Sequence, residues 1–288
     1  MCVSVSPRVG VRFSDTVLYA AEVLDPSGRT VHVLGYQNKV QGRVGAVPSV
    51  RSLLPFSRCG NAMILPFPAV ARTMTRANVL DTSDCRDVLQ DIGDAVMRPA
   101  RYAILSPGLS SAAPAAPVQV FEAAGIYTVV LAQDPRDIPG ALQQVPISKR
   151  PALNPALFDA YARWYPNWTV ALCCFNNRRA QLAKPLLWWY EPSIPDQLFL
   201  PTLDCHTGDV PDLNATVAVD HVIAVGSHRM VGGEPVRYRS RPPRVRSYLL
   251  NSVIARPYSG QSPNGDFICA LDDVRRGIFD AMRSRPAA

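Results

Sequence analysis

Cys2 is the residue of this chain whose type and position could do chemistry with the least help from others. If Met1 is removed, residue 2 carries both a thiol and a free α-amino group. An α-amine titrates at roughly 7.7–8.0, so it can act as the general base for the thiol beside it. The position therefore predicts a nucleophile that attacks an amide carbonyl while its own amine takes and returns the proton. A cysteine that is simply an inert strand residue is the alternative.

The residues around Cys2 match a known pattern. The opening MCVSVSPRVGVRFSD resembles the start of the choloylglycine hydrolase and penicillin V acylase family of N-terminal-nucleophile amidases. The resemblance implies that Asp25 orients the terminus and that Asn177, in the pair Asn176-Asn177, donates to the developing oxyanion. Glu22 stands where the family has an arginine. A cofactor-independent amide hydrolase acting on a small-molecule amide is the function that this resemblance implies.

A basic stretch, VRYRSRPPRVRSYLL at 236–250, suggests a different function. Arg237, Arg239 and Arg241 alternate, so on a strand they would share one face. Arg244 and Arg246 continue the charge beyond two prolines, and such a row could hold the phosphates of a nucleic acid or another anionic partner. A solvated edge strand is the simpler interpretation. This alternative makes the protein a non-catalytic, β-rich binding or scaffold protein.

Two further groups have competing interpretations. The segment 203–221 holds aspartates, Cys205 and two histidines, but their spacing matches no standard zinc or calcium motif. We therefore expect no metal there. All four tryptophans lie between Trp164 and Trp189, where they could line a ligand pocket or pack a core.

Composition limits the class of protein. The chain has 288 residues, of which 48% are hydrophobic and 18% charged, with a formal net charge of +7. Its seven cysteines include no CxxC pair, which does not indicate a secreted disulfide framework. No signal peptide and no apolar run of membrane-spanning length is evident. We expect a cytoplasmic location, no membrane insertion and, since no nucleotide-binding glycine motif occurs, no cofactor.

The distribution of apolar residues favours strands over helices. Strands are predicted over ten segments: 2–37 as a hairpin around Asp25-Pro26-Ser27-Gly28, then 61–69, 101–106, 118–123, 126–133, 167–175, 185–192, 198–203, 216–227 and 244–255. Helices are predicted at 83–97 with Ser83 as N-cap, at 134–145, at 151–165 with Asn154 as N-cap, and at 272–282. The segment 108–117 is low in complexity and predicts a flexible loop. Together these elements predict one domain, 1–288, of class α+β, in which three to four helices cover mainly antiparallel sheets.

Overall fold

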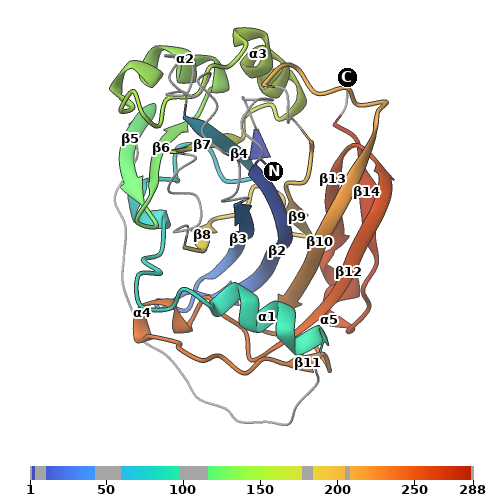
Figure 1. Ribbon diagram of the computed structural model, residues 1–288. Coiled ribbons are helices and arrows are strands. Elements are labelled where there is room, and N and C mark those ends of the chain that lie inside the picture. The colour runs from blue at the N-terminus through green and yellow to red at the C-terminus, as the bar shows by residue number, and fades with distance from the viewer. Residues whose placement is uncertain are drawn as a thin grey trace.

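A computed structural model describes most of the chain, and three β-sheets make up its framework (Figure 1). The described residues are 2–3, 11–42, 60–97, 116–176, 184–204 and 208–286. Among them no helix is long and apolar enough to cross a membrane.

The first sheet has five strands, all antiparallel to their neighbours. Their order across the sheet is β1 (Cys2–Val3), β4 (Asn61–Phe67), β7 (Thr169–Phe175), β6 (Tyr127–Ala132) and β5 (Val118–Ala123). Every residue of β4, β6 and β7 is buried, because layers cover both faces of this sheet.

The second sheet has six strands and contains the one parallel pair among the described strands. Its order is β11 (Glu234–Pro235), β12 (Ser252–Pro263), β10 (Thr216–Ser227), β2 (Val11–Leu24), β3 (Thr30–Gly42) and β8 (Leu186–Tyr190). Strands β2 and β10 run parallel, with Glu22 beside Ser227 at their ends. A small third sheet is formed by β14 (Ala281–Ser284), β13 (Asp266–Ala270) and β9 (Gln197–Leu200).

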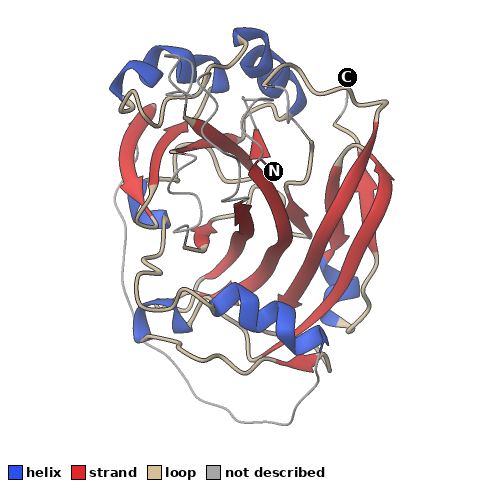
Figure 2. Ribbon diagram, viewed as in Figure 1, coloured by secondary structure: helices blue, strands red, loops and turns tan. Residues whose placement is uncertain are grey.

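Short helices cover the outer faces of the two large sheets (Figure 2). They are α1 (Val88–Met97), α2 (Ile138–Ala141), α3 (Pro155–Trp164) and α4 (Pro243–Arg246). A fifth helix, α5 (Leu271–Arg275), instead buries Leu271 and Val274 in the central core. Three-residue 3₁₀ turns occur at Arg76–Asn78, Pro135–Asp137 and Leu142–Gln144.

Three apolar cores hold these layers together. The central core lies between the sheets and includes Leu18, Met63 and Trp188. A second core packs α2 and α3 on the outer face of the five-stranded sheet. A third packs α1 on the outer face of the six-stranded sheet, where Leu89 and Ile92 are fully buried. Burying a side chain of this size contributes about 1.5–3 kcal/mol, so packing, more than intrinsic propensity, keeps these short helices folded.

The structure confirms the predicted α+β class and much of the local pattern. Asp25-Pro26-Ser27-Gly28 turns between β2 and β3, and Gly28 adopts a φ of 82° in that turn. Asn154 caps α3 by accepting a hydrogen bond from the backbone amide of Ala156. Trp188 and Trp189 point to opposite faces of β8, because successive side chains alternate along a strand. Trp188 lies in the central core and Trp189 packs against the core on the other face.

Three predicted elements are wrong in part. The first helix begins at Val88, because Ser83 is held in a turn by Asp81 and caps no helix. The segment 236–242 forms no strand, and 244–255 divides into α4 and the start of β12.

The closing helix is shorter than predicted. It ends at Arg275 because Gly277 takes a left-handed φ of 76°. Beyond that glycine the chain becomes extended and forms β14, which pairs with β13. The predicted strand 101–106 and nearly all of the loop 108–117 lie outside the described residues.

Candidate functional site

Two of the three residues of the predicted amidase site, Cys2 and Asp25, are described, and they lie in different parts of the fold. Cys2 begins β1, the edge strand of the five-stranded sheet, and pairs with Met63 of β4. Asn177 lies outside the described residues. Asp25 follows β2 at the end of the six-stranded sheet, so Cys2 and Asp25 belong to separate layers.

The Asp25 carboxylate is occupied by its own turn. Its Oδ1 accepts from the Ser27 amide at 2.8 Å, the Ser27 hydroxyl at 2.6 Å and the Arg29 amide at 2.9 Å. Its Oδ2 accepts from the Arg29 guanidinium at 2.8 and 3.0 Å. Burial opposes ionisation, but these hydrogen bonds outweigh it and hold the pKa of Asp25 below its ordinary value. This geometry makes Asp25 the residue that fixes the β2–β3 turn.

The basic stretch faces the acidic residues of the chain itself. Arg239 donates from its backbone amide and its Nε to the buried Asp91 carboxylate of α1, at 2.9 and 2.5 Å. Asp87 and Asp94 lie 3.8 Å from the same guanidinium. This arginine therefore fastens the loop 236–242 to α1.

The other arginines of the stretch have comparable roles. Arg244 pairs with Asp84 and Asp81. Arg241 is partly buried, donates to the carbonyls of Arg246 and Leu249, and lies 5.0 Å from the ring centre of Tyr238. Arg237 is also engaged, and Arg246 lies at the end of α4. Of the five arginines, Arg239 and Arg244 are therefore the ones whose charge is matched by aspartates in the described structure.

The segment 203–221 also serves the backbone where it is described. Asp212 accepts a hydrogen bond from the Asn214 amide, and Asp209 accepts one from the Asn154 side chain that caps α3. Cys205 and His206 lie outside the described residues. In the described part of the chain, no three metal-ligating side chains come together.

The four cysteines whose side chains are described carry no activated thiol. Cys85, Cys173, Cys174 and Cys269 are buried and free. Burial raises the pKa of Cys85 to about 11, and of Cys174 and Cys269 to about 12. A thiol with so high a pKa is almost never a thiolate near neutral pH.

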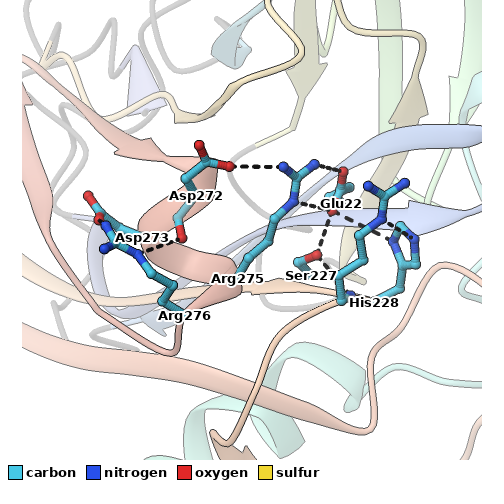
Figure 3. A network of polar contacts seen from close by, with 8 residues as sticks. Glu22, Ser227, His228, Asp272, Asp273, Arg275 and Arg276 are labelled. Carbon is cyan, nitrogen blue, oxygen red and sulfur yellow. Dashed lines mark hydrogen bonds and ion pairs between the residues drawn. The ribbon is translucent and has the colours of Figure 1, made fainter.

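The structure reveals a buried polar cluster that the sequence analysis missed. Strands β2, β3 and β10 each have one face that lines the central core. At one end of that face lie the buried polar residues Glu22 on β2, His32 on β3 and Ser227 on β10. Each is two residues from a core residue on the same face. Arg275 of α5 and His228 complete the group, which we call the Glu22 cluster (Figure 3). A glutamate within the apolar run VLYAAEVL was the one signal in the sequence that could have indicated it.

Glu22 is the centre of this cluster and is only 1% exposed. Its carboxylate accepts from the Ser227 hydroxyl at 2.5 Å and from Arg275 Nη2 at 2.5 Å. His228 Nδ1 lies 3.7 Å from the same carboxylate. Burial opposes ionisation, yet the bonds from Arg275 and Ser227 outweigh it and lower the pKa of Glu22. Arg275 also pairs with Asp272 at 3.0 Å, so the cluster attaches α5 to the ends of β2 and β10.

His32 is the unusual member of the cluster. It pairs with Glu22 across β2 and β3, is 1% exposed, and neither ring nitrogen hydrogen-bonds to any described residue. Its ring packs edge-on against Tyr190 with centroids 5.8 Å apart. Burial lowers the pKa of His32 to about 4, although the Glu22 charge opposes the shift. His32 is therefore neutral near pH 7.

Three exposed apolar side chains belong to segments that contain, or bond through their backbone to, residues of this cluster or of α5. Val231 is 75% exposed, and its backbone amide donates to the Arg275 carbonyl at 2.9 Å. Ile278, 46% exposed, follows α5 and bonds through its amide to the Asp273 carbonyl. Leu24, 43% exposed, comes two residues after Glu22. We call Leu24, Val231 and Ile278 the apolar rim.

Comparisons with known proteins give only a distant structural likeness. No known protein family and no curated protein matches the chain. The crystal structure of baculovirus P35 is similar over 94% of this chain and 92% of its own, at 13% identity and a TM-score of 0.41. P35 in its complex with caspase-8 matches over 91% of this chain and 89% of its own, at 13% identity and a TM-score of 0.38. TM-scores of this size assign neither a family nor a function.

Proposed function

We propose that this protein is a non-catalytic, β-rich binding protein that engages a protein partner through the apolar rim. The observation that carries the proposal is the placement of Val231. Its apolar side chain is exposed to solvent, while its backbone amide bonds to the last residue of α5. The ion pair between Arg275 and the buried Glu22 anchors that helix.

A fixed apolar side chain is well suited to binding. Scattered exposed hydrophobic residues are normal, but a group of them on one part of a surface marks an interaction site. The backbone amides of Val231 and Ile278 bond to carbonyls of α5, and α5 is itself anchored. The backbone at these two residues therefore loses little conformational entropy on binding, which favours affinity. Three of the six large hydrophobic residues that are exposed in the described chain belong to the rim.

The arrangement of charge favours a protein partner over a nucleic acid. Arg239 and Arg244 already pair with aspartates, so these two cations of the basic stretch would have to exchange partners to contact phosphates. Near the rim, Arg275 pairs with Asp272 and Arg276 pairs with Asp273. Mixed charge around an apolar centre is typical of protein interfaces.

A matched pair of variants tests this proposal. Val231→Ser with Ile278→Ser removes the rim, whereas Ile147→Ser changes an equally exposed residue elsewhere, 72% accessible to solvent. Proteins captured by the wild-type chain are identified, purified and titrated against all three forms by calorimetry. The purified panel includes caspase-8, which one compared structure holds in complex with P35.

We expect the double variant to lose at least about tenfold in affinity for a true partner, as interface anchors do on truncation, and Ile147→Ser to bind like wild type. Equal binding by all three forms would refute the proposal. The Cys2 amidase stays a prediction, and hydrolysis of an amide substrate by the protein lacking Met1 would support it instead.

A further inference from the structure

We propose that the Glu22 cluster is an acid-released latch, which holds α5 against the six-stranded sheet at neutral pH and frees it in acid while both large sheets stay folded. The inference concerns α5 alone and stands whether or not the apolar rim binds a partner.

The first support is the way α5 is attached. This helix has only five residues, too few to be stable alone. Its last residue, Arg275, donates to both oxygens of Glu22, at 2.5 and 3.3 Å. Leu271 and Val274 are its buried apolar residues. The attachment therefore combines these two buried side chains with one ion pair, and a proton can neutralise the carboxylate of that pair.

The second support is the set of charges around that carboxylate. From β10, the Ser227 hydroxyl donates to Glu22, and His228 faces it through Nδ1. Arg229 donates to the Nε2 of His228 at 3.2 Å, so the proton of a neutral His228 is on Nδ1. From α5, Arg275 faces Glu22 and is shared with Asp272. Among the described residues, Glu22 is thus the one buried anion that pairs with Arg275.

The third support is His32, which faces Glu22 from β3, with Tyr190 of β8 on its other side. Neither ring nitrogen hydrogen-bonds to a described residue, so a protonated imidazole there would be a buried cation without a hydrogen bond, and the Arg275 charge would repel it. Protonation of His32 therefore acts against the latch from the strand side.

The direction of the pH effect follows from linkage. When α5 is released, His32 and Glu22 meet water and regain ordinary proton affinity, so the released form binds more protons below about pH 6.5. The pKa of His32, lowered to about 4 in the closed form, predicts that the opening equilibrium increases about 20-fold between pH 7 and pH 5. Glu22 adds to the effect at lower pH, because its pKa is also lowered in the closed form.

Hydrogen exchange of the full chain tests the latch. The reporters are the amides of Val231, Gly277 and Ile278, which bond to carbonyls of residues 273–275, and the reference is the amides of β7. After correction for intrinsic rates, the reporters should lose about 20-fold in protection between pH 7 and pH 5, while β7 should keep its protection.

Three variants show whether the cluster is responsible. Glu22→Gln keeps the shape but removes the charge, so the reporters should exchange at least about tenfold faster at pH 7. His32→Leu should remove most of the pH response. Asp273→Asn breaks a pair at the end of α5, with Arg276, that does not involve Glu22, and should leave protection unchanged.

Three results of these exchange experiments would contradict the latch. The latch is overturned if the reporters lose protection only when β7 does. It is also overturned if His32→Leu keeps the full pH response, or if the reporters in Glu22→Gln are protected normally at pH 7. If Glu22→Gln fails to fold, Arg275→Met, which removes the pair from the side of the helix, gives the same test.

Discussion

Replacing His32 with leucine should make the protein more resistant to acid unfolding. The side chain is buried, and neither nitrogen hydrogen-bonds to a described residue, so an apolar residue of similar volume removes a proton-binding group without leaving a bond unmade. Leucine also continues the apolar face of β3, on which Leu34 and Tyr36 lie in the central core.

The size of this stability difference follows from the pKa of His32. The unfolded chain binds a proton at about 6.5, whereas burial lowers the pKa of the folded protein to about 4. Because the folded pKa is the lower one, the full stability is present above pH 6.5 and is lost as the pH falls towards 4. Each pH unit of that gap corresponds to about 1.4 kcal/mol, so His32 alone should remove about 3 kcal/mol between pH 7 and pH 4.

Urea unfolding at half-unit pH intervals measures this contribution. Other groups titrate in both proteins, so the quantity of interest is the difference between wild type and His32→Leu at each pH. That difference should change by about 3 kcal/mol in favour of the variant from pH 7 to pH 4. Parallel curves for the two proteins, whatever their offset, would refute the reasoning.

Three other substitutions test the contacts described above by chemical denaturation. Asp25→Ala should cost about 2 kcal/mol, since it leaves the amides of the β2–β3 turn without their acceptor; a loss below about 0.5 kcal/mol would show that the turn forms without it. Gly277→Ala should cost about 1–3 kcal/mol, because the residue has a φ of 76° and a Cβ there would lie 2.5 Å from the Val231 carbonyl oxygen; a neutral effect would contradict the left-handed end of α5. Arg239→Ala should cost at least about 2 kcal/mol by leaving the buried Asp91 uncompensated, whereas Arg244→Ala, whose partners Asp81 and Asp84 are exposed, should cost under about 1 kcal/mol; equal costs would contradict this assignment.

Local chemistry made part of the fold predictable. The hairpin turn at Asp25 and the capped start of α3 at Asn154 depend on residues close together in sequence, and the structure has both. Alternation within LLWWY likewise predicted that Trp188 and Trp189 face opposite sides of their strand.

The misjudged elements depend on features that periodicity does not register. The closing apolar residues have helical spacing, but Gly277 adopts a left-handed conformation and Met282 then enters a strand. The basic stretch has strand-like alternation, yet Arg239 finds its partner Asp91 in a helix that lies 148 residues away in the sequence.

The Glu22 cluster could not be predicted from the sequence for the same reason. Ser227 and Arg275 follow Glu22 by 205 and 253 residues, and they meet it only because β10 joins β2 in parallel. No local pattern specifies such a pairing.

The reactivity of Cys2 distinguishes most directly between catalysis by Cys2 and a non-catalytic protein that binds through the apolar rim. The measurement is the rate of iodoacetamide alkylation of Cys2 against pH, in protein lacking Met1 and in its Asp25→Asn variant. Because Asp25 serves its own turn, we expect Cys2 to titrate as an ordinary thiol near about 8.5, with the same profile in both proteins. A hyper-reactive Cys2 that titrates near neutral pH and is slowed by Asp25→Asn would contradict the binding function and establish the nucleophile.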